Sequence, residues 1–243
     1  MPEQLFLTRV LNHLFAAPAD ALLRAFHVTP TFPDAPISNG AAMEILVCAI
    51  LLVMFVLVRA SLSVESPGGL QHMFEGIHGF VEGQSRDVIG HHSERFTPFL
   101  VALGLFILLA NLFGIVPGLE SPTASPVVPL GLALCAFCYY QYQGLRQNGI
   151  GYLKHFLGPM WWLSPLMLPL EIISHLARVM SLTIRLYANM FAGDMVTLVF
   201  FSLIPLAIPV IFLGLHIGVA LLQAYIFVLL TTVYLAGAVA TEH

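Results

Sequence analysis

Long apolar runs separated by short polar segments dominate this chain, and they predict helices that cross a membrane several times. The first run, residues 43–62, carries no charge between positions 45 and 58. It provides the roughly 20 residues that a helix needs to cross a bilayer. Two further ordinary spans are expected at about residues 96–117 and 126–142. The predicted fold class is therefore an all-α polytopic membrane protein.

In residues 65–95 polar and apolar residues are interleaved instead of forming a long apolar run. This pattern predicts an amphipathic helix lying at the membrane interface. Its polar positions include His72, Glu75, His78 and Glu82. These four side chains are compatible with a metal site or with a solvated polar face. The sequence offers no matched ligand set elsewhere, which favours the polar face. Residues 1–42, here called the N-terminal arm, mix charged and apolar residues with several prolines and predict an aqueous or surface-lying segment.

The last third of the chain predicts two unusually long helices, at about residues 163–191 and 206–240. They are separated by a hydrophobic stretch that follows Gly193 and contains Pro205. Helices of this length measure roughly 40 to 50 Å and exceed the roughly 30 Å of hydrocarbon in a bilayer. They must be strongly tilted. We therefore divide the chain into the N-terminal arm (1–42), a transmembrane region (43–158) and a tilted helical hairpin (159–243).

Composition strengthens the membrane assignment. Charged residues make up 9% of the 243 residues, hydrophobic residues make up 58%, and the mean hydropathy is +0.90. A soluble domain usually carries about 25% charged residues. The net charge of −4 and a single lysine argue against nucleic acid as a partner. Cys135 and Cys138 form a CxxC pair, but no second pair completes a zinc site, which favours a role in helix packing.

Basic residues indicate the orientation in the membrane. One side of the predicted spans carries Arg59, Arg86, Arg95, Arg146 and Lys154. The loop at residues 118–125 has Glu120 and no basic residue. By the positive-inside rule the basic side is cytoplasmic and the N-terminus is outside. Arg9 and Arg24 argue for the opposite orientation but lie far from the first span.

A stripe of polar residues marks one side of each long helix. On a helical wheel the stripe of the first helix fills a sector of about 80°. It consists of Glu171, His175, Arg178, Arg185 and Asn189. The second helix repeats the pattern with His216, Gln223 and Tyr234. Two such stripes facing each other predict an ion path or a rotor-facing surface. The alternative is that Glu171 and Arg178 merely neutralise each other and that Arg185 snorkels to an interface.

Arg185 carries the strongest functional signal. An arginine at bilayer depth costs roughly 2.5 to 3.5 kcal/mol, and apolar or hydroxyl residues surround this one. Its guanidinium stays protonated, so it acts as a fixed positive charge and cannot relay protons. A carboxylate that moves between this charge and lipid must lose and regain a proton. This chain has no mobile carboxylate of that kind, which implies that a partner subunit provides it.

Three sequence blocks resemble subunit a of F-type ATP synthases. They are SLTIRLYANMFAGD at residues 181–194, LGLH at 213–216 and LQAYIF at 222–227. The resemblance extends over roughly residues 40–243. It implies a stator subunit that provides two aqueous half-channels to the carboxylates of a rotating c-subunit ring. It also implies the peripheral-stalk b subunits and the rest of the synthase as partners.

The resemblance implies roles for individual residues. Arg185 matches the essential arginine that separates the half-channels, and Asn189 and Gln223 match polar residues beside it. Asp194 and His216 match the pair of the outer half-channel, where many relatives have Glu instead of Asp. Glu171 and His175 match the exit path toward the cytoplasm. Gly193 together with His216 is typical of the bacterial form, which implies the bacterial inner membrane.

Other protein classes fit less well. A secondary ion-coupled transporter also places polar residues at mid-membrane, but the two halves of this chain show no internal repeat. An intramembrane metalloprotease lacks its HExxH motif, and nucleotide chemistry lacks a phosphate-binding loop. The sequence therefore predicts no cofactor and no metal in this chain, and His216 favours protons over sodium ions as the coupling ion.

Overall fold

The computed structural model describes residues 5–25, 36–63, 68–90, 93–116, 119–149, 164–203 and 208–240. These residues form helices without any strand. The α-helices are α1 (Phe6–Ala25), α2 (Asn39–Ala60), α3 (Gly69–Ile89), α4 (Thr97–Phe113), α5 (Val127–Asn148), α7 (Ser164–Leu203) and α8 (Ile208–Val239). Two short 3-10 helices, η1 (Ser93–Arg95) and η2 (Pro122–Ala124), precede α4 and α5. The predicted all-α fold class is confirmed.

Local signals explain several helix ends. The Ser38 hydroxyl accepts the backbone N–H of Ala41 at 3.2 Å and begins α2. Gly90 ends α3 with a φ of +85°, a conformation that side chains with a Cβ rarely adopt. The predicted amphipathic helix is α3, whose Phe74 and Val81 are buried. Its polar side pairs His72 with Glu75 and His78 with Glu82.

Three of the described helices are long and apolar enough to cross a membrane: Asn39–Ala60, Leu166–Phe200 and Ile211–Val239. The helix at the second predicted span, α4, is apolar but only 17 residues long. The helix at the third, α5, has the length, but its last turns are rich in Gln and Tyr, which lowers its hydropathy. Cys135 and Cys138 on α5 are exposed, so they do not pack inside the chain as the sequence suggested.

The first long helix continues beyond its predicted end. It passes through Gly193 and reaches Leu203 instead of ending near Phe191. A glycine inside a helix costs only about 1 kcal/mol, and the apolar residues that follow continue the helix up to the region of Pro205. Asp194 therefore belongs to the same helix as Arg185. The predicted end points at residues 163 and 206 lie outside the described residues.

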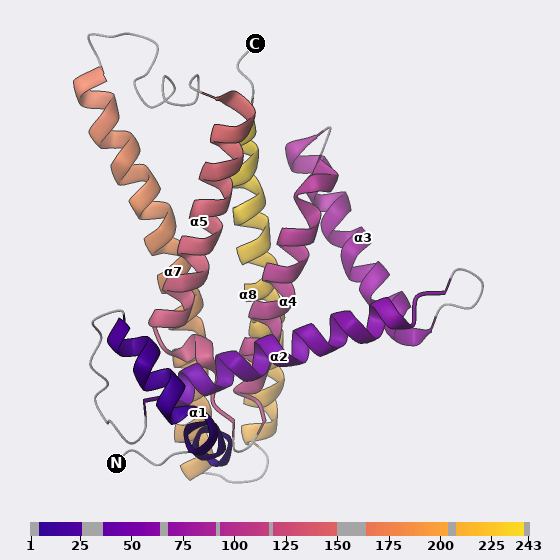
Figure 1. Cartoon of the computed structure of the whole chain (residues 1–243), viewed down its shortest axis with the longest axis vertical. Coiled ribbons are helices and arrows are strands. Elements are labelled where there is room, and N and C mark those ends of the chain that lie inside the picture. Colours follow the sequence, from indigo (N-terminus) through magenta and orange to yellow (C-terminus); the bar gives the residue numbers. More distant parts are fainter. Residues whose placement is uncertain are drawn as a thin grey trace.

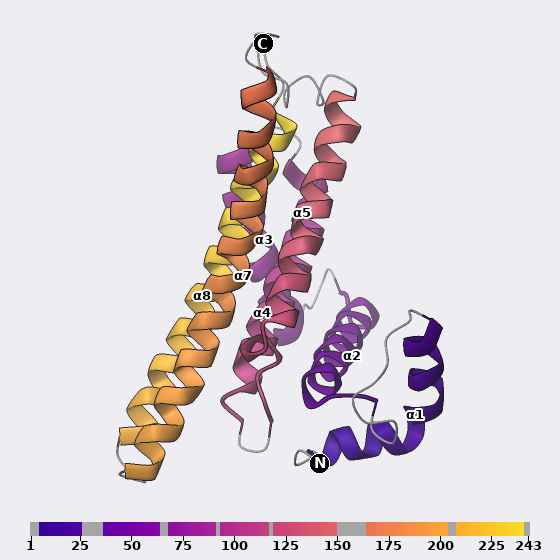
Figure 2. The ribbon, with the colours of Figure 1, turned by 90° about the vertical axis from the view of Figure 1, so that its left-hand side faces the viewer.

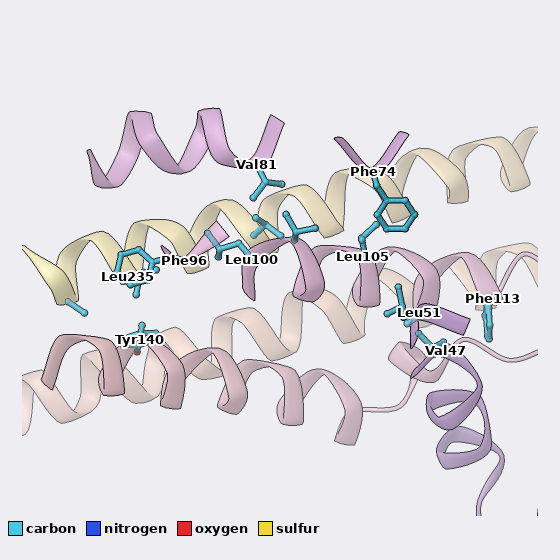
Figure 3. Packing of buried hydrophobic residues seen from close by; sticks show 14 of the residues in the cluster. Val47, Leu51, Phe74, Val81, Phe96, Leu100, Leu105, Phe113, Tyr140 and Leu235 are labelled. Atoms are coloured by element: carbon cyan, nitrogen blue, oxygen red, sulfur yellow. The ribbon is translucent and has the colours of Figure 1, made fainter. Parts of the chain in front are cut away.

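Two hydrophobic clusters hold the bundle together and meet at α4 and α8. The first joins residues of α2, α3, α4 and α8 with Tyr140 of α5, and it includes Val47, Phe74 and Leu100 (Figure 3). The second joins α4, α5, α7 and α8 around Ile107, Leu186 and Phe227, each fully buried. In water, burial of such a side chain stabilises the fold by roughly 1.5 to 3 kcal/mol. Within lipid, close packing between the helices takes the place of this hydrophobic contribution.

The helices α7 and α8 form an antiparallel pair with its turn at one end of the molecule (Figure 2). Near that turn the two helices contact each other directly, whereas toward their other ends they diverge and α5 lies beside both (Figure 1). The described part of the N-terminal arm and η2 lie at the turn end, and the C-terminal end of α8 lies at the opposite end. In Figure 1, α2 runs across the bundle rather than along it.

Candidate functional site

Arg185 lies near the middle of α7 and is partly exposed. Its Nη2 donates a hydrogen bond to the Ser181 hydroxyl one turn earlier, at 3.3 Å. Within the described ranges, no carboxylate of this chain forms an ion pair with Arg185. The antiparallel register places Phe227 of α8, which is fully buried, at the same level as Arg185. Arg185 therefore has no acidic partner in the described part of the chain.

Asp194 and His216 meet where α7 and α8 approach their turn. Their atoms Oδ1 and Nε2 are 3.9 Å apart, with the His216 side chain 5% exposed and that of Asp194 26% exposed. Gly193 makes this approach possible, because a Cβ at that position would lie 2.9 Å from His216 Nδ1. Real Cβ atoms essentially never show so short a contact. The glycine therefore lets the imidazole pack directly against the backbone of α7.

A cavity of about 920 Å³ opens beside this pair. Its lining includes Asp194 and His216, the segment 119–121 before η2, and residues 36–40 together with Thr8 of the N-terminal arm. Glu120 adds an exposed carboxylate to the lining. The cavity is thus lined both by the buried histidine and by the exposed acid Glu120.

Asn111 holds the η2 segment beside this cavity through hydrogen bonds. Its Oδ1 accepts the Thr123 hydroxyl at 2.7 Å, and its Nδ2 donates to the Ala220 carbonyl of α8 at 3.5 Å. The Thr123 hydroxyl also pairs with that of Ser121 at 2.8 Å. All three polar side chains are buried. Asn111 therefore links α4, η2 and α8.

The two predicted polar stripes face each other over part of their length. The Asn189 amide donates to Gln223 Oε1 at 2.7 Å, and Gln223 is 2% exposed. Farther from the turn, the Arg178 guanidinium carbon lies 5.1 Å from the centroid of the Tyr234 ring, a cation–π distance. Arg178 and Glu171 do not form an ion pair within the described residues. Mutual neutralisation therefore does not explain this pair.

His175 joins a second polar cluster at the divergent end of the hairpin. Its Nε2 lies 3.3 Å from Glu171 Oε1, and its Nδ1 lies 3.2 Å from the Tyr140 hydroxyl. Tyr140 comes from α5, is 1% exposed and also lies near Tyr234, with 6.1 Å between ring centroids. The cluster therefore uses α5 as the neighbour of α7, whereas the Asp194 cluster uses α8.

Two of these contributors escaped the sequence analysis. Tyr140 was not singled out within the third predicted span, and Glu120 appeared only as evidence for loop orientation. A tyrosine and glutamines in an otherwise apolar span, and an acid in an otherwise uncharged loop, were the available signals. Neither signal identifies the neighbouring helix, because that depends on how the helices pack.

The two clusters lie on opposite sides of Arg185 along α7. Nine residues separate Arg185 from Asp194 and ten separate it from His175, which corresponds to about 14 Å and 15 Å along the helix axis. The directions of Asp194 and Glu171 around the axis differ by about 140°. A single straight channel along one side of α7 would not reach both clusters.

Comparisons with known proteins agree on one family. A family profile described as ATP synthase A chain matches residues 41–236. The chain is 57% identical over 244 residues to a protein of Koribacter versatilis named ATP synthase subunit a, with both chains fully covered. It is 52% identical to a protein of the same name from Solibacter usitatus, covering 87% of this chain and 91% of that protein. A protein of Syntrophotalea carbinolica named ATP synthase subunit a 2 is 42% identical over 197 residues, covering 79% of this chain and 84% of that protein.

Proposed function

Because the chain belongs to the ATP synthase subunit a family, we propose that it provides two separate half-channels for protons, with Arg185 between them. Family membership places the chain in the membrane sector of a bacterial F-type ATP synthase, where it serves proton transport and ATP synthesis. The proposal adds the path through this chain, its contact with a ring of c subunits and its docking of b subunits. It also places the N-terminus on the outer side.

The observation that carries the proposal is the position of an arginine without an acidic partner between two histidine–carboxylate pairs. A positive charge at bilayer depth is retained only where it has a task or a partner. Within the described residues this chain provides no such partner, so the partner is a carboxylate brought by another subunit. The proposed source is the c ring, whose carboxylates pass Arg185 one after another.

The outer half-channel uses the cavity of about 920 Å³. A proton enters past Glu120 and reaches Asp194, which is partly exposed to the cavity, and then His216, which is buried. Histidine accepts and releases protons near neutral pH, so this pair can pass a proton inward. The Asn189–Gln223 pair lies between His216 and Arg185 and continues the polar path with neutral groups.

The inner half-channel uses the cluster of Glu171, His175 and Tyr140. A proton leaving a ring carboxylate passes along these groups to the cytoplasmic side. The Tyr140 hydroxyl fixes the orientation of the imidazole from α5. The two half-channels therefore have different helix neighbours, which keeps them apart.

The rotor-facing surface is proposed to be the exposed side of α7 and α8 around Arg185. Apolar side chains such as Met180 and Ile184 on α7 are exposed there. An apolar surface with one central cation suits a sliding helix that is apolar except for a single carboxylate. Ionised carboxylate is stabilised beside Arg185, and protonated carboxylate is stabilised in lipid.

The test is proton-driven ATP synthesis by membrane vesicles that carry the assembled complex. Arg185→Ala is expected to abolish synthesis while assembly is retained, because the fixed charge is lost. Arg185→Lys is expected to fail as well, because a desolvated ammonium can lose its proton and lacks the planar fork of a guanidinium. Arg146→Ala removes an equal charge from the exposed end of α5 and is expected to preserve synthesis. Normal synthesis by the Arg185→Ala complex would refute the proposal.

A further inference from the structure

The N-terminal arm reaches the same cavity as the Asp194–His216 pair. Thr8 of α1 and residues 36–40 contribute to its lining, together with residues of the hairpin. The family profile begins at residue 41, so these residues lie outside the matched region. A segment beyond the shared family region thus forms part of the cavity beside the central titratable pair.

Asn12 holds the arm in this position. Its Oδ1 accepts the backbone N–H of Ile37 at 3.0 Å, and its Nδ2 donates to the Ile37 carbonyl at 3.1 Å. A third bond joins the two segments where the Leu5 backbone N–H donates to Asn39 Oδ1 at 3.4 Å. Asn12 is 5% exposed, so water competes poorly for its two bonds. One side chain therefore ties α1 to the backbone that lines the cavity.

The lining contributed by the arm mixes polar and apolar residues. It includes Ser38 and Asn39 beside Pro36 and Ile37, and Ser121 and Ser125 add further polar residues to the cavity. Thr8 Oγ1 is buried and has no hydrogen-bond partner among the described residues. A water molecule in a liquid occupies about 30 Å³, so a cavity of about 920 Å³ holds on the order of tens of waters.

We propose that the N-terminal arm is the outer wall of the proton-entry cavity and that Asn12 is the positioning residue that keeps this wall closed. The arm limits access to the cavity from the side, so that protons enter past Glu120 and the segment before η2. This inference rests on the proposed function, because it assigns the arm a role in the outer half-channel. It gives α1 and residues 36–40 a task that the helical hairpin cannot perform alone.

The experiment measures how fast a thiol inside the cavity reacts with a reagent from outside. Leu213 lines the cavity from α8, and Leu213→Cys is introduced after the three native cysteines are replaced by serine. The probe is a membrane-impermeant cationic methanethiosulfonate, applied to the assembled complex in right-side-out vesicles and in inverted vesicles. Asn12→Leu removes both bonds to Ile37, and Asn12→Asp removes the donor but keeps an acceptor.

Asn12→Leu is expected to raise the reaction rate of Leu213→Cys by about tenfold, because the loss of two hydrogen bonds shifts the arm toward its released state. Asn12→Asp is expected to give a smaller increase in the rate. It provides the test if the Asn12→Leu complex fails to assemble. As a matched control, Ala17→Leu alters an exposed position of α1 that does not line the cavity and is expected to leave the rate unchanged. An unchanged rate in an assembled Asn12→Asp or Asn12→Leu complex would overturn the role of the arm.

The two orientations of the vesicles separate this inference from the proposed function. Reaction in right-side-out vesicles alone supports both the outer cavity and the wall. Reaction in inverted vesicles alone, still accelerated by Asn12→Leu, would retain the wall but overturn its place in an outer half-channel. The labelling rate does not depend on whether Asp194 and His216 transfer protons, so failure of the Arg185 variants to behave as expected leaves this test intact.

Discussion

Gly193→Ala tests whether the position of His216 controls proton entry. The added Cβ would lie 2.9 Å from His216 Nδ1 and 3.1 Å from its Cε1. An ordinary contact begins at 3.4 Å, so the imidazole must move by about 0.5 Å away from α7. Because His216 is buried and faces Asp194 on its other edge, it has little room to move without changing that pair.

Two opposing energies decide the effect of this substitution on stability. Alanine in place of glycine inside a helix gains about 0.5 to 1 kcal/mol. Overpacking costs about 1 to 3 kcal/mol. Overpacking outweighs the gain, and a net destabilisation of about 1 kcal/mol is expected in the thermal unfolding of the purified complex. A displacement of 1 Å can cost about 100-fold in a transfer step, so half that distance predicts a loss of about tenfold in proton flux.

The assay compares proton flux through the membrane sector in vesicles that enclose a pH-sensitive dye. Gly131→Ala on α5 is the matched control, because nothing lies within 4 Å of the Cβ that it would add. It is expected to retain full flux and to gain a few tenths to 1 kcal/mol of stability. Wild-type flux and stability in the Gly193→Ala complex would refute the reasoning, because the contact with His216 would then have no consequence.

Two further predictions concern the polar contacts on either side of Arg185. Tyr140→Phe removes the hydroxyl that lies 3.2 Å from His175 Nδ1. We expect a loss of about 1 kcal/mol of stability in thermal unfolding, and a several-fold slower proton release to the cytoplasmic side in vesicle flux measurements. Unchanged release would show that the imidazole needs no support from α5. A double-mutant cycle of thermal unfolding, with Asn189→Leu and Gln223→Leu made singly and together, should show a coupling energy of about 1 kcal/mol. Strictly additive effects would contradict a hydrogen bond between these two side chains of α7 and α8.

Helical periodicity was sufficient to predict much of the arrangement. The wheel placed Arg178 and Asn189 on one side of the first long helix, and these residues contact Tyr234 and Gln223 of the second. Both helices are continuous, so the 100° step per residue holds over their whole length. The same argument predicted the amphipathic character of α3, whose buried residues include Phe74 and Val81.

The neighbours of each polar residue were beyond the reach of periodicity. A wheel gives the direction of His175 but does not reveal that α5 replaces α8 beside it, so Tyr140 was missed. Asp194 lay off the stripe, and its contact with His216 depends on a helix that continues through Gly193 instead of ending there. The place of α1 depends on hydrogen bonds of two side chains, Asn12 and Asn39, whose sequence context shows no pattern.

On the proposed function, Arg185 alone can both attract a ring carboxylate and prevent a proton leak. At an effective dielectric constant of about 20, two unit charges 4 Å apart interact by about 4 kcal/mol. A carboxylate that passes at this distance is stabilised by that amount, and a hydronium ion that takes a shortcut past Arg185 is opposed by the same amount. A barrier of about 4 kcal/mol slows the shortcut by about a thousandfold. At about 14 Å, the distance to each histidine–carboxylate pair along α7, the interaction falls to about 1 kcal/mol. The pairs can therefore exchange protons with water almost undisturbed, while direct transfer between them is suppressed.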